Sequence, residues 1–432
     1  MENLKIANMQ AETEEKTSSK PKRKYTRRTT SSKAKTTAKA PKPKYEKIFA
    51  LDIGTRSVIG IVADKTPAGL KIIATERMEH KTRAMEDGQI HDVPQVASVI
   101  DTVKKALIKK VGPLKSAAVA AAGRALYTMT ASAEMEFSGI ITPEQERSLD
   151  FAGVQAAQAQ LATSGTVEDL ANYYCVGYST VKYELDGTKL KTLVGQRGRV
   201  ASATVIATFL PRQVIDSMHS ALQSVKLDMH ALTLEPIAAI NVLIPPTMRH
   251  LNLVLVDIGA GTSDVAITRN GSVIAYGMVP QAGDEITDAI SQQYLLDFNV
   301  AEQLKRDATN GLQCHFADIM GMEYDLSATE VLKPVLPNIR KLAESIAQQI
   351  LELNGNEPPQ AIILVGGGSL TPHLSDYVAE IMNLPMGRVA VRHPDKIDGI
   401  VDIPEELRLP DAVTPLGILK IASLNTLHFL RV

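Results

Sequence analysis

The sequence predicts an α/β protein with two similar halves, because one pattern occurs twice, about two hundred residues apart. The first copy is Phe49-Ala50-Leu51-Asp52-Ile53-Gly54-Thr55-Arg56-Ser57, and the second is Val254-Leu255-Val256-Asp257-Ile258-Gly259-Ala260-Gly261-Thr262-Ser263-Asp264. In each copy an apolar strand ends in Asp, a turn with Gly and hydroxyl side chains follows, and a second apolar run returns. A third element is the apolar run Ala361–Val365, which opens into Gly366-Gly367-Gly368-Ser369 before a helical pattern.

The two repeated turns have the composition of a phosphate-binding hairpin. Glycine permits positive φ and lets backbone N–H groups approach an anion closely. The hydroxyls add donors, and Asp52 and Asp257 at the strand ends could hold Mg²⁺ through water. A single copy would be weak evidence for phosphate binding, since hairpin turns in general favour these residues. Two facing copies would clamp a nucleoside triphosphate.

The glycine run at 366–368 completes this prediction. A strand, three glycines and a helix start make room for a nucleoside and present helix N–H donors. The three elements together predict nucleotide binding.

Composition allows more than one domain core, with 432 residues and 44% hydrophobic side chains. No run of 18 apolar residues occurs, so no transmembrane helix is expected. The start lacks the layout of a secretion signal. The two cysteines, Cys175 and Cys314, lack metal-ligand spacing and fit a reducing cytoplasm.

The first 45 residues are strongly basic. They hold 13 Lys and Arg against four Glu, a net charge of +9. Since the whole chain has a net charge of −1, the other 387 residues carry −10. Because aliphatic side chains are scarce, this tail is predicted to be disordered. It could contact anionic lipid or nucleic acid, or simply serve as a solubilising tail.

The elements of the first half follow from periodicity and start signals. A three-stranded meander is expected first, and a helix follows the Asp92-Val93-Pro94 signal. From about Pro113 to Leu210, β-like runs surround a helix and indicate a small α+β insert. The expected strands are Ile48–Ile53, Val58–Asp64, Leu70–Glu76, Ser116–Ala122, Ala131–Phe137, Tyr174–Leu185 and Arg199–Phe209, and the insert helix is Pro143–Leu161.

After the insert, a helix over Pro211–Val225 leads to a strand ending in Glu235-Pro236. This places one carboxylate at the carboxyl edge of a strand, where ligands sit in open α/β sheets. A helix-start glutamate beside proline is an equally good interpretation. Further elements are expected at Ser272–Val279, at Ser327–Leu353 with a break near Pro334 and Pro337, and as a buried helix over Asp411–Ile421.

These segments resemble the actin-like ATPase fold of actin, DnaK-type chaperones and sugar kinases, and within it the FtsA family of bacterial cell-division proteins. The likeness covers about Lys47 to Ser423. It is carried by both repeated turns and by Pro280-Gln281-Ala282-Gly283-Asp284, Ala301-Glu302-Gln303-Leu304-Lys305, Ile363 to Ser369 and Ala412 to Ile421. An insert in the first half, before the Glu235 strand, is typical of FtsA; the pilus-assembly ATPase PilM shares this plan.

The resemblance implies two RNase H-like halves around a nucleotide cleft, with an SHS2-type α+β insert in the first half. The implied segments are 1–45 as a tail, 46–112 with 211–247 as the first core, 113–210 as the insert, 248–285 with 356–423 as the second core, 286–355 as a helical part over the cleft, and 424–432 as a short C-terminal tail.

The resemblance also implies roles around ATP and Mg²⁺. Asp52 and Asp257 would hold the metal, and Glu235, with Asp257, would serve hydrolysis by orienting water. The implied nucleotide-binding residues are Gly54, Thr55, Arg56, Gly259, Ala260, Gly261, Thr262 and Ser263 for phosphate, Gly283, Asp284, Glu302 and Lys305 near ribose and base, and Gly366, Gly367, Gly368 and Ser369 beneath the adenine.

Two positions depart from the pattern. Many actin-fold proteins have Lys where this chain has Ser57, and Arg56 stands one place earlier. We therefore expect slow ATP turnover, with nucleotide acting mainly as a switch of conformation and polymerisation. The last residues, 424–432, are shorter and less basic than the amphipathic membrane helix with which FtsA typically ends.

The implied function is a filament-forming adaptor of cell division. It would assemble into head-to-tail filaments and bind the tubulin-like protein FtsZ. It would bind other division proteins through the insert. The basic tail could reach an anionic membrane, giving a cytoplasmic protein peripheral to the inner membrane; nucleic acid is not the expected partner.

Other classes remain open: a PilM-like pilus ATPase, a small-molecule kinase with Asp264 or Asp284 as base, or a DnaK-type chaperone.

Overall fold

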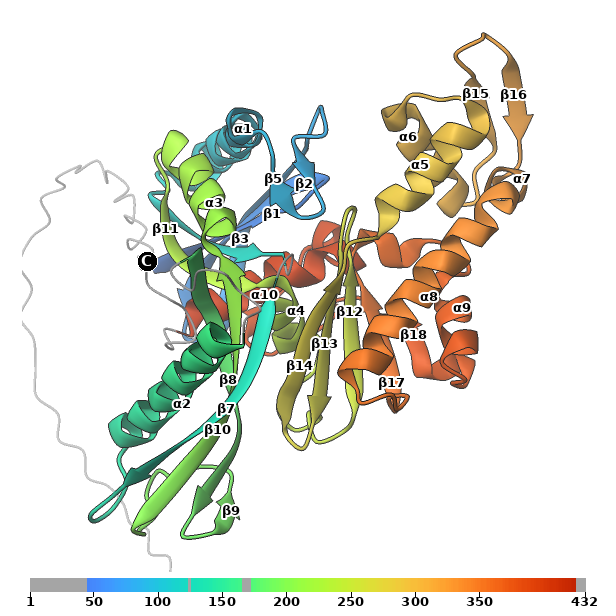
Figure 1. Cartoon of the computed structure of the whole chain (residues 1–432). Helices are drawn as coiled ribbons and strands as arrows, with labels where there is room; N and C mark the ends of the chain where they lie inside the picture. Colours follow the sequence, from blue (N-terminus) through green and yellow to red (C-terminus); the bar gives the residue numbers. More distant parts are fainter. Residues whose placement is uncertain (1–44, 123–125, 165–171, 425–432) are drawn as a thin grey trace, which may run out of the picture. The chain divides into compact units, whose positions relative to one another are not determined.

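The computed structural model describes residues 45–122, 126–164 and 172–424, and its two main β-sheets share one topology (Figure 1). Residues 1–44 of the tail predicted to be disordered (1–45), and residues 425–432 of the short C-terminal tail (424–432), lie outside the described residues.

The first sheet has the strand order β11-β6-β1-β2-β3-β19. Neighbouring strands run antiparallel from β1 to β3, whereas β6 and β11 run parallel to β1. The helices α1 (Val93–Val111) and α3 (Arg212–Ser224) pack against it. The strands are β1 (Glu46–Ile53), β2 (Ser57–Thr66), β3 (Gly69–Glu79), β6 (Ser116–Ala121), β11 (Asp228–Leu234) and β19 (Ile400–Val401).

The second sheet, of order β14-β13-β12-β17-β18, repeats this arrangement. Its first three strands form an antiparallel meander, and β17 and β18 then run parallel to β12. The strands are β12 (Leu253–Ile258), β13 (Ser263–Arg269), β14 (Ser272–Val279), β17 (Ala361–Val365) and β18 (Val389–Val391). The predicted duplication is confirmed as a repeat of topology.

Two apolar helices lie between the sheets (Figure 1). The helix α4 (Glu235–Leu243) leaves the first sheet and packs on β12 and β13, while α10 (Val413–Ser423) leaves the second half and packs on β1 and β2. Their side chains join one buried core with both sheets, represented by Ile61, Leu255 and Leu416. The buried helix predicted over Asp411–Ile421 is confirmed, starting two residues later.

The insert is a four-stranded sheet of order β7-β10-β8-β9 covered by α2. Thr142 and Gln145 form a capping box at the start of α2. The side chains of Leu149 and Leu161 lie on the apolar side of this helix and are buried. The elements are β7 (Tyr127–Glu136), α2 (Pro143–Thr163), β8 (Tyr173–Leu185), β9 (Thr188–Leu190) and β10 (Val200–Pro211).

One strand lies in a different sheet from the one predicted. The run Ser116–Ala122 was expected in the insert, but as β6 it pairs with β1 and β11 in the first main sheet. Its small apolar side chains are buried on both faces, as expected for a central parallel strand.

The segment after β14 is helical with one hairpin. The helices α5 (Gly283–Tyr294) and α6 (Phe298–Thr309) precede α7 (Ala328–Leu332) and α8 (Leu336–Leu353). A 3-10 turn over Lys333–Val335 separates α7 from α8, which confirms the break expected at the prolines. The helix α9 (Leu374–Ile381) follows β17.

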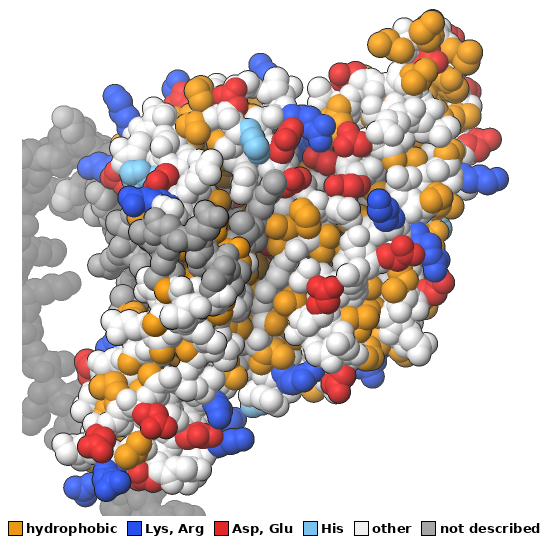
Figure 2. All heavy atoms as spheres, viewed as in Figure 1, with side chains coloured by type: hydrophobic (Ala, Val, Ile, Leu, Met, Phe, Trp, Pro, Cys, Tyr) orange, Lys and Arg blue, Asp and Glu red, His pale blue; other side chains and the backbone are white. Residues whose placement is uncertain are grey.

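The hairpin of β15 (Cys314–Ala317) and β16 (Glu323–Leu326) was not predicted. Phe316 and Tyr324 lie opposite each other in the hairpin and stack with ring centres 4.9 Å apart. Its tip exposes Ile319, Met320 and Met322, which form a hydrophobic cluster at one end of the face in Figure 2. Among the residues that the structure describes, no helix is long and apolar enough to cross a membrane.

Candidate functional site

The two repeated turns have the same backbone geometry. In turn 1 (residues 54–57) the N–H of Gly54 donates to the carbonyl of Ser57 at 3.1 Å. In turn 2 (residues 259–262) the N–H of Gly259 donates to the carbonyl of Thr262 at 2.9 Å. Asp52 and Asp257 each lie two residues before the first glycine of their turn, one place before the strand end. The repeat therefore places two carboxylates in equivalent positions.

The glycine-rich turn after β17 packs directly on turn 2. Gly366 has φ 81°, and a Cβ there would collide with the carbonyl oxygen of Ile258 and with Oδ1 of Asp257. A Cβ on Gly368 would lie 2.7 Å from the carbonyl oxygen of Gly259. Because real Cβ atoms do not approach that closely, both positions require glycine.

These turns face one cavity of about 540 Å³. Thr55 and Thr262 place hydroxyls at its wall, and Gly88, from the turn between the short strands β4 (Met85–Glu86) and β5 (Gln89–Ile90), donates its N–H to Thr55 Oγ1 at 3.1 Å. The sequence-predicted residues that line the cavity are Asp52, Gly54, Thr55, Arg56, Glu235, Asp257, Gly259, Ala260, Thr262, Gly283, Glu302, Lys305, Gly366, Gly367 and Gly368.

Four predicted residues do not line it: Gly261, Ser263, Asp284 and Ser369. The hydroxyl of Ser263 donates to the carbonyl of Gln281 at 2.7 Å, and that of Ser369 donates to the carbonyl of Gly366 at 2.7 Å. Asp284 is buried and pairs with Arg56. The side chains of Ser263, Asp284 and Ser369 are thus bound to other protein groups.

One side of the cavity is acidic. Burial and the neighbouring Asp257 and Asp411 together raise the pKa of Asp52 to about 7, although Arg77 lowers it. Burial, together with Asp411, raises the pKa of Asp257 to about 6, although the Thr414 hydroxyl, which donates to Asp257, lowers it. The clustered carboxyls therefore ionise less readily than free aspartates.

Glu235 belongs to this acidic side. It is the first residue of α4, half-buried at the cavity wall. Burial raises its pKa well above the ordinary value, and Asp264, Asp52 and Asp257 act in the same direction. The helix-start position and the cavity position therefore coincide in one residue.

Two acidic-side residues were missed by sequence reasoning. Asp411 pairs with Arg77 at 2.5 Å, and Thr414 bonds Asp257 from the start of α10. The sequence marks this segment as a buried helix, and a hydroxyl near its first turn is the only local signal.

The opposite side is an ion-pair network. Nζ of Lys305 lies 2.8 Å from Oε2 of Glu302 and donates to the carbonyl of Gly283 at 2.9 Å. Nη2 of Arg56 lies 2.7 Å from Oδ1 of Asp284 and 3.7 Å from Glu302. Burial alone would raise the pKa of Glu302, but Lys305, Thr287 and Arg56 outweigh it and hold that pKa at about 2. Glu302 therefore stays ionised at neutral pH.

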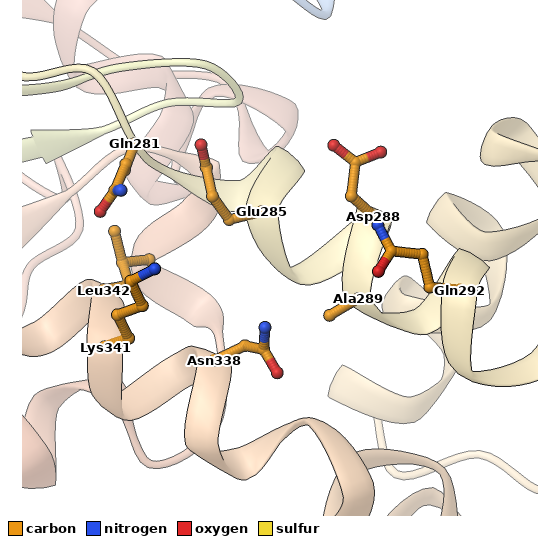
Figure 3. Close-up of a pocket in the computed structure, with 8 residues that line it drawn as sticks. All are labelled: Gln281, Glu285, Asp288, Ala289, Gln292, Asn338, Lys341 and Leu342. Atoms are coloured by element: carbon orange, nitrogen blue, oxygen red, sulfur yellow. The ribbon is translucent and has the colours of Figure 1, made fainter.

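A second, smaller cavity of about 170 Å³ lies between α5 and α8 (Figure 3). Most of the residues that line it have polar side chains, and Glu285 among them also accepts the Ala282 N–H at the start of α5. The lining residues are Gln281, Glu285, Asp288, Ala289, Gln292, Asn338, Lys341 and Leu342. The helix α5 thus contributes to both cavities.

Comparison with known proteins finds sequence similarity to a family of cell-division proteins. A family model described as "Cell division protein FtsA" matches residues 254–417. FtsA of Pseudomonas aeruginosa is 24% identical over 392 residues, which cover 86% of this chain and 88% of that protein. FtsA of Bacillus subtilis is 20% identical over 394 residues, covering 88% and 84%.

A solved structure shows the same fold. A chain of the PilM-PilN type IV pilus biogenesis complex superposes with a TM-score of 0.64 at 15% identity, covering 87% of this chain and 98% of that one. With the duplicated strand order, this similarity confirms the predicted actin-like ATPase fold. The predicted resemblance is confirmed too: the chain is similar to FtsA cell-division proteins over most of its length.

Proposed function

We propose that this chain binds Mg-ATP between its two halves and uses it to control assembly as a cell-division adaptor. The observation that carries the proposal is the convergence of turn 1, turn 2 and the glycine-rich turn on one cavity. Backbone N–H groups, hydroxyls and close-packed glycines are the features that bind phosphate chains.

Mg²⁺ fits the acidic side of this cavity. No three His, Cys, Asp or Glu side chains are arranged for direct metal ligation within residues 45–122, 126–164 and 172–424. Magnesium usually keeps several waters and takes one or two carboxylates plus phosphate oxygens. Asp52 and Asp257, in equivalent positions and with raised pKa values of about 7 and 6, would be stabilised in their ionised forms by such a cation.

The position of each remaining cavity-lining residue suggests which part of the nucleotide it would contact. Thr55 and Thr262 would donate to phosphate oxygens, and Glu302 and Lys305 would face the ribose and base. Glu235 would orient the attacking water, which is the main demand of phosphoryl transfer beyond positioning and charge neutralisation. Turn 1 has Ser57 where many actin-fold proteins have Lys, and its Arg56 is paired with Asp284. Because turn 1 then offers no free basic side chain to the phosphates, ATP turnover would be slow.

The adaptor part of the proposal rests on the FtsA relationship. The chain would form head-to-tail filaments, bind an FtsZ-type tubulin homologue, and meet other division proteins through the insert. It would lie in the cytoplasm near the inner membrane. The PilM similarity supports the fold only, and no observation here favours a kinase or a DnaK-type chaperone over the adaptor.

The experiment is a paired measurement of ATP affinity by calorimetry and of sedimentation with and without Mg-ATP. Wild-type protein should bind Mg-ATP and pellet in its presence. Asp257→Ala should lose at least tenfold in magnesium-dependent affinity, because a carboxylate near the metal is removed, and it should lose the nucleotide-dependent pellet.

The matched control is Asp216→Ala, an exposed aspartate on α3 that pairs with Arg212. It should behave as wild type in both assays. Well-folded wild-type protein without ATP affinity would refute nucleotide binding, whereas binding without any pellet would refute the filament.

A further inference from the structure

Phe298 lies where the first half of the chain meets the helices α5 and α6. It is the first residue of α6, half-buried, and two arginines from the first half contact its ring. The guanidinium carbon of Arg56 in turn 1 lies 4.9 Å from the ring centre, and that of Arg83 lies 4.4 Å away. Both distances are within the range of cation–π attraction.

Ion pairs cross the same boundary among the described residues, one of them between Arg56 and Glu302 on α6 at 3.7 Å. Arg56 reaches Asp284 at 2.7 Å, and Arg83 reaches Asp288 at 3.6 Å, both on α5. Arg306 on α6 lies 2.7 Å from Glu79 at the end of β3. Each pair joins a residue from the first half to a residue of α5 or α6, so separating the halves there breaks all of them together.

The pairs are anchored on the helical side by Glu302. Its Oε1 lies 2.9 Å from Nε of Arg306, and its Oε2 contacts Lys305. Nη2 of Arg56 donates to Asp284, and its guanidinium group lies over the Phe298 ring. Its buried Nε has no hydrogen-bond partner among the residues that the structure describes. Arg56 is thus committed to this boundary.

The boundary adjoins the candidate nucleotide cavity. Arg56, Glu79, Glu302 and Arg306 line that cavity, while Phe298 and Arg83 lie just outside its lining. We propose that Phe298, with Arg56 and Arg83, forms a latch that holds the cavity closed and sets the rate of nucleotide exchange. This inference rests on the proposed function, because it concerns the regulation of that same site.

A latch has a distinct kinetic signature. Entry and exit both require the halves to part, so weakening the latch should raise the association and dissociation rates by similar factors. Loss of a direct nucleotide contact would raise the dissociation rate alone.

The test measures both rates by stopped flow with a fluorescent N-methylanthraniloyl ATP and magnesium. Phe298→Leu keeps apolar volume but removes the aromatic face, and Phe298→Tyr keeps that face. We expect both rates to rise roughly tenfold in Phe298→Leu, as the loss of two cation–π contacts suggests, and to stay near wild type in Phe298→Tyr. Arg83→Ala should raise them less, and should add little in the Phe298→Leu background.

Phe151→Leu is the control, because Phe151 is 45% exposed on the insert helix α2. It should leave both rates unchanged. Wild-type rates in Phe298→Leu and in Arg83→Ala, or a rise in dissociation alone, would overturn the latch and leave the proposed function standing. Failure of folded wild-type protein to bind the probe would overturn both.

Discussion

Glu235 combines two properties at the residue scale: it begins α4, and it lies at the cavity wall among other carboxylates. If it orients water, Glu235→Gln should slow ATP hydrolysis at least tenfold, since an amide cannot accept a proton and general-base groups contribute about 10²-fold or more. Nucleotide affinity should stay equal or rise, because one repelling carboxylate near Asp52 and Asp257 is removed. Single-turnover phosphate release and calorimetry measure the two effects separately.

Glu144→Gln provides the matched comparison. Glu144 occupies the first turn of α2 beside Pro143, so it shares the helix-start environment of Glu235 but is exposed and outside the cavity lining. Hydrolysis at the wild-type rate in Glu235→Gln would leave Glu235 as a helix-start residue only.

The cavity-lining residues predicted from sequence share a local signal, whereas the missed ones depend on distant partners. Thr55 and Thr262 lie in turns whose composition is visible in the chain. Ser263 was misplaced because it starts β13, where neighbouring side chains alternate between faces and its own points to Gln281. The pairing of Arg56 with Asp284 joins residues 228 positions apart, which no local pattern encodes.

At the scale of elements, long periodic segments were predictable and very short ones were not. The meanders, the capped helix α2 and the proline break before α8 all have signals of several residues. The strands β4 and β19 have two residues each, too few for a period of two to show. The strand β6 was recognised but placed in the wrong sheet, because its partners β1 and β11 are set by topology.

Gly417 in α10 gives a prediction for how the central helices pack. A Cβ at this position would collide with the backbone of Ala238 in α4, whose Cα would lie 2.9 Å away. In an ordinary helix Gly→Ala stabilises by roughly 0.5–1 kcal/mol, but here overpacking should reverse the sign. We expect Gly417→Ala to lower the free energy of unfolding by about 1–3 kcal/mol in urea titrations.

Gly387→Ala tests whether that loss is due to packing. Nothing lies within 4 Å of a Cβ built on Gly387, and its φ is not positive. Its free energy of unfolding should change by less than about 0.5 kcal/mol. Equal changes in the two variants would contradict close packing of α10 on α4.

At the scale of the whole molecule, the exchange of helices between halves connects the cavity to the core. The helix α4 starts at Glu235 and packs on the second sheet, and α10 carries Thr414 to Asp257 while packing on the first sheet. If one half moves about the cavity, it therefore shifts α4 or α10, the helix that packs on its sheet but follows the other half in the sequence. This geometry suits a protein in which bound nucleotide changes assembly.

The distribution of charge gives the last prediction. Residues 1–45 carry +9 while the rest of the chain carries −10, so we expect attraction to an anionic membrane to come mainly from the first segment. Each basic residue near such a surface contributes up to about 1 kcal/mol. Deleting residues 1–44 should therefore weaken binding to vesicles containing phosphatidylserine at least tenfold in flotation assays.

Salt and lipid composition separate this attraction from unspecific adhesion. Full-length protein should bind less as salt rises from 0.1 to 0.5 M, conditions chosen because the Debye length is about 10 Å at the lower value and shortens as salt is added. It should also bind phosphatidylcholine vesicles no better than the deletion variant does. Replacing Lys20, Lys22, Arg23, Lys24, Arg27 and Arg28 by Gln keeps the length and should reproduce much of the loss. If the shortened and charge-neutralised proteins bind anionic vesicles as tightly as wild type, the membrane contact lies elsewhere in the chain.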